Sequence, residues 1–163
     1  MKTTILMLTI LLTLGVKAQD KRFTAFVMTD PIATTKDGFN LGIGVEYQMT
    51  IFYFKARAFS FPELRGASYF DLYGAIGLNY HNRWNEIRIF GGLKGGNIWR
   101  DGKTPYPSYG VEAGFEYYPN GSDSGIYFGL QGSYLFRTDD KFWNSQATGY
   151  WRENGFVKIG YAF

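Results

Sequence analysis

The sequence contains no cysteine and only one histidine, His81, and each shortage excludes a kind of site. Without cysteine the chain cannot carry a disulfide framework, a cysteine-ligated zinc site, a thiol nucleophile or a lipid-modified N-terminal cysteine. One histidine excludes any site that needs two imidazoles. Charged residues make up only 19% of the chain, and no apolar run reaches the roughly 18 residues of a membrane-spanning helix. An α-helical membrane protein is therefore not expected.

Aromatic residues and glycine are abundant instead. Aromatics make up 20% of the 163 residues, and there are 21 glycines. An apolar fraction of 45% is too high for a disordered chain. The length fits one domain of about 150 residues. The composition therefore predicts a single all-β domain.

The N-terminal segment has the order of a secretory signal peptide. A positive charge at Lys2 precedes the apolar stretch TTILMLTILLTLGV, and Val16 and Ala18 are the small residues expected before a cleavage site. We expect residues 1–18 to be removed after Sec export, which leaves a domain at residues 19–163. A buried N-terminal helix is the alternative. Cleavage removes Lys2 and Lys17 and leaves 15 basic against 14 acidic residues, so a nucleic-acid partner is not expected.

The rest of the chain alternates with period two. In FNLGIGVEYQ (residues 39–48), aromatic and aliphatic side chains occupy one face, and glycine and polar residues occupy the other. Strict alternation indicates a β-strand, because successive side chains point to opposite sides of a sheet. Convincing helical spacing is absent. The same reasoning predicts eight strands, at residues 22–29, 39–48, 50–60, 68–80, 83–99, 109–118, 125–137 and 149–163.

The predicted connections alternate in length. Those after the second and fourth strands are tight, at 48–50 and 81–82. The one at 119–124 is longer than these two but contains an Asn-Gly turn signal. The others are longer, at 30–38, 61–67, 100–108 and 138–148. Short turns at one end and longer loops at the other, on an even number of antiparallel strands, are typical of an up-and-down transmembrane β-barrel.

The two strand faces indicate which side meets lipid. One face is apolar and carries bulky aromatics near the strand ends, as expected for interfacial girdles. The other face is rich in glycine and carries charges that we expect to form an ion-pair network in the lumen: Glu46, Lys55, Arg57, Asp71, Arg88, Lys94, Glu112, Glu116, Arg137 and Lys158. A water-soluble barrel, such as a lipocalin, would have the opposite polarity.

The C-terminal strand, GFVKIGYAF, is the most specific motif in the chain. It places Val157, Ile159, Tyr161 and Phe163 at alternate positions and ends on an aromatic residue. With this motif the chain resembles the small eight-stranded outer-membrane barrels of Gram-negative bacteria, the OmpA-like and OmpX-like, porin-family barrel domains. The resemblance implies residence in the outer membrane, and it implies that these four residues form the signal read by the barrel-assembly machinery. The loops are short compared with many relatives, and a second, peptidoglycan-binding domain is not expected.

The sequence contains no convincing arrangement of catalytic residues. His81 lies in a predicted turn, Tyr80-His81-Asn82-Arg83, with no serine or acid beside it, and a nucleophile needs a positioned base. Glu112 and Glu116 are roughly 13 Å apart along a strand, too far for a shared-proton pair. Asp139-Asp140 lacks a third oxygen ligand for a cation. We therefore expect no catalytic residues, no metal site and no cofactor.

The predicted function is structural or surface-interacting. Eight strands enclose a space that side chains can just fill, so we expect a packed interior. A narrow or gated pore for ions or small solutes is the first alternative, and a secreted lipocalin-like carrier is the second. We expect a monomer in outer-membrane lipid with no identified external ligand. Four aromatics in predicted loops are candidate partner contacts: Phe61, Tyr106, Phe142 and Trp143.

Overall fold

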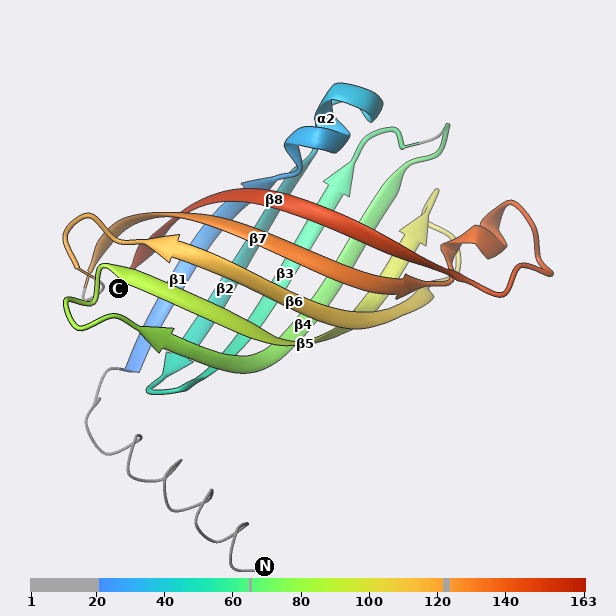
Figure 1. Cartoon of the computed structure of the whole chain (residues 1–163). Coiled ribbons are helices and arrows are strands. Elements are labelled where there is room, and N and C mark those ends of the chain that lie inside the picture. Colours follow the sequence, from blue (N-terminus) through green and yellow to red (C-terminus); the bar gives the residue numbers. More distant parts are fainter. Residues whose placement is uncertain (1–20, 65, 122–123) are drawn as a thin grey trace, which may run out of the picture.

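The computed structural model describes residues 21–64, 66–121 and 124–163, which form a closed antiparallel barrel (Figure 1). Each strand pairs with the next along the chain, and β1 pairs with β8 to close the ring. The strands are β1 (Lys21–Thr29), β2 (Leu41–Met49), β3 (Phe52–Phe61), β4 (Tyr69–His81), β5 (Ile87–Arg100), β6 (Tyr106–Tyr117), β7 (Gly125–Arg137) and β8 (Tyr150–Ala162). The predicted eight-stranded up-and-down barrel is confirmed. The proposed signal peptide lies outside the described residues.

Two strand boundaries differ from the prediction by several residues. β5 begins at Ile87 and not at residue 83, because the side chain of Asn82 accepts hydrogen bonds from the backbone N–H groups of Glu86 and Ile87 and fixes a turn. β6 begins at Tyr106, so the connection after β5 spans only residues 101–105. That connection is shorter than residues 118–124 after β6, and the predicted alternation of loop lengths is wrong at this point.

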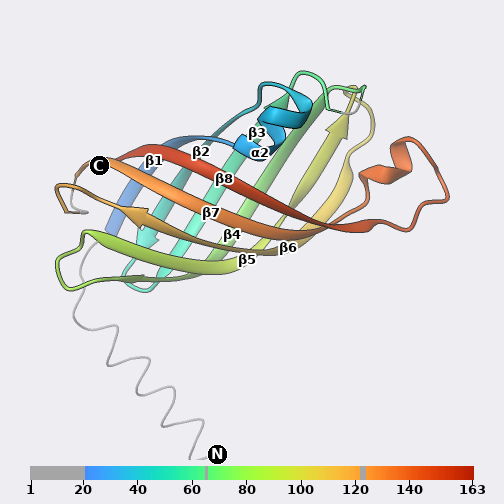
Figure 2. The same cartoon turned by 45° about the horizontal axis from the view of Figure 1, so that its top comes forward.

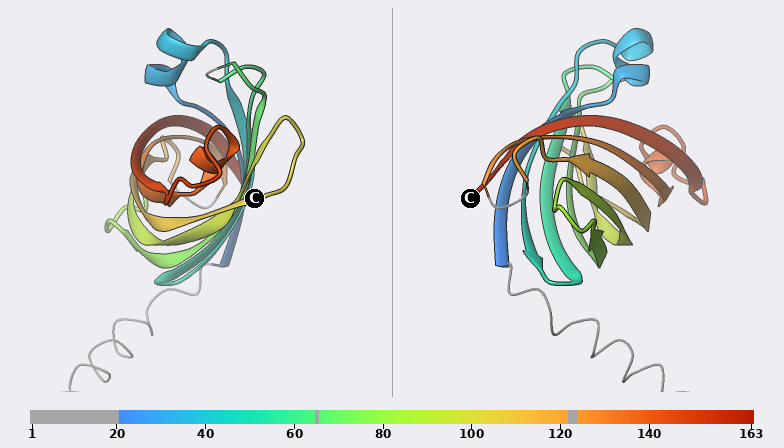
Figure 3. Two further views of the ribbon diagram at one scale, coloured as in Figure 1. Left: turned by 90° about the vertical axis from the view of Figure 1, so that its right-hand side faces the viewer. Right: turned by 60° about the vertical axis from the view of Figure 1, so that its left-hand side comes forward.

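Two short helices correct the prediction that helices are absent. α2 (Pro31–Asp37) follows β1 and lies outside the ring of strands (Figures 1 and 3), and a 3-10 helix, η2 (Asp139–Phe142), follows β7. The Asp30 carboxylate caps α2 by accepting a hydrogen bond from the Ala33 N–H at 2.8 Å. Asp followed by Pro is a helix-start signal that can be read from the sequence, although a helix of two turns shows no clear periodicity.

The strand faces are sorted by polarity around the ring. Leu41, Ile43, Leu130 and Ile159 point outward and are exposed, as are most aliphatic and aromatic residues at alternate positions. The inward positions carry the charges and a set of aromatic rings. Figure 2 shows how the strands curve around one central axis. Because the apolar side chains are outside and the charged ones inside, the wall has the polarity of a transmembrane barrel.

Inward-facing glycines make room for the aromatic rings that fill the bore. A Cβ atom at Gly44 would clash with the Phe26 ring, and one at Gly114 would clash with the Phe90 ring. The ring of each aromatic residue thus covers the backbone of a glycine on another strand. This packing fills the interior without spreading the strands.

Gly77 offers a test of this packing. A Cβ atom there would lie 2.5 Å from Gly92 Cα and 2.7 Å from the Tyr53 ring, whereas a Cβ atom at the outward-facing Gly95 meets nothing nearer than 3.9 Å. Gly77→Val should therefore lower the free energy of unfolding by about 1–3 kcal/mol or more, because overpacking displaces both ring and backbone. Gly95→Val should leave it nearly unchanged. Equal urea unfolding midpoints for the two variants would contradict this description of the bore.

Candidate functional site

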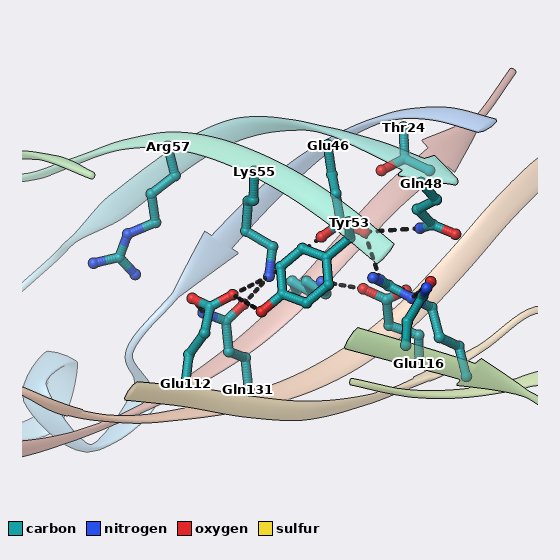
Figure 4. A network of polar contacts seen from close by, with 12 residues as sticks. Thr24, Glu46, Gln48, Tyr53, Lys55, Arg57, Glu112, Glu116 and Gln131 are labelled. Atoms are coloured by element: carbon teal, nitrogen blue, oxygen red, sulfur yellow. Dashed lines mark hydrogen bonds and ion pairs between the residues drawn. The ribbon is translucent and has the colours of Figure 1, made fainter. Parts of the chain in front are cut away.

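The centre of the barrel contains a chain of alternating charges drawn from facing walls (Figure 4). Arg88 Nη1 lies 2.6 Å from Glu46 Oε1 and 2.7 Å from Glu116 Oε2. Lys55 Nζ lies 3.2 Å from Glu46 Oε2 and 2.7 Å from Glu112 Oε1. Lys55, Glu46 and Arg88 therefore link Glu112 to Glu116 across the bore. All five side chains are almost completely buried.

Neutral side chains add hydrogen bonds to the same three carboxylates. Tyr53 donates its hydroxyl to Glu112 Oε1 at 3.0 Å, and Gln131 donates to Glu112 Oε2 at 2.8 Å. Tyr118 donates to Glu116 Oε2 at 2.6 Å, and Gln48 donates to Glu46 Oε1 at 2.8 Å. Buried charges persist only when they are paired and hydrogen-bonded, and these contacts meet that condition for the three glutamates.

Lysines and aromatic rings extend the network along the barrel. Lys158 pairs with Glu116 and lies 4.8 Å from the centre of the Phe90 ring. Lys94 Nζ lies 3.9 Å from Glu112 and 4.6 Å from the centre of the Tyr73 ring. Cation–π contact of this kind stabilises an ammonium that has left water.

A separate pair lies toward the end of the barrel that carries α2. Arg57 Nη2 is 3.3 Å from Asp71 Oδ2, and the Tyr69 hydroxyl donates to the same oxygen at 2.6 Å. The Arg57 guanidinium also lies 4.5 Å from the centre of the Phe156 ring. The cavity beside this pair has a volume of only about 10 Å³, which is about the space of one water molecule. The bore is thus filled at this level.

The outer loop at residues 138–149 is held by a cluster that the sequence reasoning missed. Asp139 accepts hydrogen bonds from Arg100 at 2.7 and 2.9 Å and from Arg137 at 2.9 and 3.0 Å. Arg100 also donates to the backbone carbonyl of Leu64 at 3.0 Å. Three connections are therefore tied together at one end of the barrel. Both Arg100 and Asp139 fall in predicted loops, where the charge of each residue is the only signal that the sequence offers.

These arginines also set the titration of Asp139. Burial disfavours the charged carboxylate, but the Arg137 guanidinium and the hydrogen bonds from Arg137 and Arg100 outweigh burial and hold the pKa of Asp139 below its ordinary value of 3.8. A carboxyl with a depressed pKa in the folded state contributes full stability above its ordinary pKa and loses it as the pH falls through the lower value. The loop should therefore stay closed at neutral pH and open only below about pH 4.

Asp139→Asn should open the same loop at neutral pH, because the neutral amide no longer balances two buried guanidinium groups. We expect trypsin to cleave after the exposed Lys141 about tenfold faster, corresponding to the loss of one or two charge-assisted hydrogen bonds. Asp37→Asn, on α2, is the matched control and should cleave at the wild-type rate. Unchanged cleavage of the Asp139 variant would show that the loop is held by other contacts.

The structure places all ten predicted lumen residues inside the barrel. The described residues bury eight basic and six acidic side chains in total, because Arg22, Arg100, Asp30 and Asp139 join the ten. The four residues of the proposed assembly signal, at 157, 159, 161 and 163, all point outward and are exposed.

The predicted loop aromatics divide into two groups. Phe61 is not a loop contact: it ends β3, is buried, and packs against Phe59 and Tyr69 with ring centres 5.3 and 5.7 Å away. Tyr106 begins β6 and packs partly buried against the core, so it is not in a loop either. Phe142 and Trp143 do lie in the loop after β7, where Trp143 is half exposed.

His81 is not the exposed turn residue that the sequence suggested. It ends β4, is partly buried, and lies with its ring centre 6.2 Å from that of Tyr118. Within the described residues His81 makes no hydrogen bond to a serine or a carboxylate. The same part of the chain contains no cluster of three or more histidine, cysteine, aspartate or glutamate residues able to hold a metal ion. It also contains no helix long and apolar enough to span a membrane.

Comparisons with solved structures return small outer-membrane barrels. The N-terminal β-barrel domain of Pseudomonas aeruginosa OprF is 14% identical, with a TM-score of 0.49 over 88% of this chain and 96% of that domain. Neisserial surface protein A is 10% identical, with a TM-score of 0.49 over 87% and 93%. Yersinia pestis Ail is 12% identical, with a TM-score of 0.48 over 88% and 100%. No protein-family model and no curated protein sequence matches the chain.

Proposed function

We propose that the protein is a small integral outer-membrane β-barrel with a closed, ion-paired interior and a structural or surface-interaction role. The single observation that supports this most strongly is the inverted polarity of the wall. The exposed belt consists of aliphatic and aromatic side chains, such as Ile43, Leu93 and Leu130, whereas the ten charged side chains at the inward strand positions are buried. A protein dissolved in water would expose its charges and bury these residues.

The filled bore supports a structural role over transport. The charges in the centre are neutralised by partners within hydrogen-bond distance, and aromatic rings occupy the space between them. A conducting channel needs a continuous water-filled path, and the cavity of about 10 Å³ near Arg57 does not supply one. A lipocalin-like carrier needs an apolar ligand cavity within the barrel, which a charged interior does not offer.

The surface-interaction role is assigned to the end of the barrel opposite the start of β1 and the end of β8. The connections after β1, β3, β5 and β7 lie at this end, and the Asp139 cluster fixes the longest of them, residues 138–149. Trp143 lies half exposed on this loop, with the Arg100 guanidinium 4.8 Å from its ring. A rigid loop that presents an aromatic side chain is suited to contact with a partner.

Cell fractionation tests the proposal. The protein should remain in the outer-membrane fraction after a urea wash, and it should migrate differently in a gel before and after boiling, because a lipid-stable barrel resists detergent until heated. Recovery as a soluble periplasmic or secreted protein, with no shift on boiling, would contradict the proposal.

A further inference from the structure

The small cavity beside Arg57 is lined mainly by positive charge. It lies inside the barrel, toward the end that carries α2, and Arg57, Arg137 and Arg152 line it from β3, β7 and β8. Two acids, Asp30 and Asp71, lie in the same lining. The volume of about 10 Å³ admits one water molecule or one monatomic ion and excludes anything larger.

Two of these three arginines have N–H groups without a hydrogen-bond partner. Arg57 is almost completely buried, and its Nε atom makes no hydrogen bond. Arg152 points inward on β8, as Asn154 does, and its Nη1 atom is shielded from water and also makes none. Arg137 differs, because its Nε and Nη2 atoms donate to Asp139. Buried donors of a charged group are costly to leave unpaired, so the cavity calls for an acceptor.

The acids of the lining are already engaged. Asp71 Oδ2 lies 3.3 Å from Arg57 Nη2 and accepts the Tyr69 hydroxyl at 2.6 Å. Asp30 Oδ1 caps α2 by accepting the Ala33 N–H at 2.8 Å. A water molecule in the cavity would add donors of its own, whereas an anion only accepts. The arrangement therefore favours an anion over water.

The balance of charge inside the barrel points the same way. Within residues 21–64, 66–121 and 124–163, eight basic and six acidic side chains are buried. Arg152 faces inward, is partly buried, and forms no ion pair with a carboxylate in this part of the chain, so it adds to the excess. Buried charge persists only when it is compensated, and one anion beside Arg57 and Arg152 offsets part of the excess.

A small ion can reach the cavity from the side of the barrel. The pairing of β1 with β8 stops at Thr29 with Val157, and α2 lies beside the part of β8 that continues (Figure 1). A groove of about 830 Å³ lies between α2 and residues 150–155 of β8. Asp30, Arg152 and Asn154 line both this groove and the cavity. The route does not pass through the ion pairs at the centre of the bore, which stays closed.

We propose that Arg57 and Arg152 hold one monovalent anion of halide size, such as chloride, in this cavity. The amide of Asn154 can supply a further N–H donor. Apolar side chains, including Phe59 and Phe61, complete the lining and disfavour strongly hydrated anions such as sulfate. The proposal goes beyond the proposed function and does not rest on it, because the cavity lies inside the barrel whatever surrounds the outer wall.

The unfolding midpoint in urea tests the site. The full chain is folded in detergent, and chloride or bromide replaces gluconate at constant ionic strength. The midpoint of the wild type should rise with halide concentration, because a ligand of the folded state stabilises it by mass action. Arg152→Gln should need about tenfold more chloride for the same rise, since it loses a charge-assisted hydrogen bond. Lys36→Gln removes one positive charge from the groove alone and should keep the wild-type dependence.

A crystal grown in bromide locates the ion. The anomalous signal should give one peak between Arg57 and Arg152, and the peak should be absent from Arg152→Gln. A wild-type midpoint that is equal in chloride and gluconate would overturn the proposal, as would an equal rise in the wild type and Arg152→Gln, which indicates a general effect of salt. An ordered water molecule in the cavity without anomalous signal would also overturn it.

Discussion

Replacing Arg88 with alanine should lower the free energy of unfolding by about 3–5 kcal/mol, because it leaves two buried carboxylates without their shared counter-ion. Arg88 is fully buried and bridges Glu46 and Glu116 at 2.6 and 2.7 Å. Its Nε also donates to the side chain of Asn79 at 3.0 Å. The measurement is the urea midpoint of the barrel in lipid vesicles, followed by tryptophan fluorescence.

Arg83→Ala is the matched control for this experiment. Arg83 lies in the exposed turn between β4 and β5, so its loss should change the free energy of unfolding by less than about 0.5 kcal/mol. If Arg88→Ala and Arg83→Ala unfold at the same urea concentration, the interior charges are hydrated, and the bore is wetter than the ion pairs indicate.

Placing arginine at Ile43 should cost about 2–4 kcal/mol, because the guanidinium would face hydrocarbon near the middle of the bilayer. Ile43 is 57% exposed on the outer wall of β2, between Val27 on β1 and Ala58 on β3. In a barrel surrounded by water, the same change would move a polar side chain onto a wet surface and cost almost nothing. The loss of stability therefore shows whether lipid or water surrounds the outer wall. It is measured as the shift of the unfolding midpoint in vesicles.

Met49→Arg, at the end of the same strand, is the control for depth. Met49 also points outward, but it precedes the tight turn to β3, where the arginine can reach the lipid headgroups. Its cost should be about 0–1 kcal/mol. Equal costs at Ile43 and Met49 would contradict a bilayer positioned around the middle of the strands.

The alternation of side chains was enough to predict the strands and their two faces. Ile43 and Glu46 lie on the same strand at an odd and an even position, so their side chains point to opposite sides of the barrel wall, because a strand has a period of two. The alternation predicted the wrong environment for a side chain only where the boundary of a strand was misplaced. Phe61 points to the same side as the buried Phe59, but the predicted strand ends at residue 60, one residue before the end of β3, and so leaves Phe61 in a loop.

The pairing of the interior charges could not be predicted in the same way. Which acid meets which base depends on the stagger of the strands around the ring, which brings Glu46 of β2 to Arg88 of β5 across the bore. Alternation within one strand contains no information about that stagger. The Asp139 cluster was missed for a related reason. It joins the end of β5 to the start of a loop after β7, and each residue alone looks like a solvated charge.

The conductance of the wild-type protein in a planar bilayer tests the closed interior most directly. Because paired charges and aromatic rings fill the bore, the inserted protein should give no steady current at moderate voltage. Insertion is verified in the same preparation by the mobility shift on boiling. A steady, ohmic single-channel current from verified protein, with ion selectivity that changes in Glu112→Ala, would contradict the sealed bore and make the protein a narrow pore.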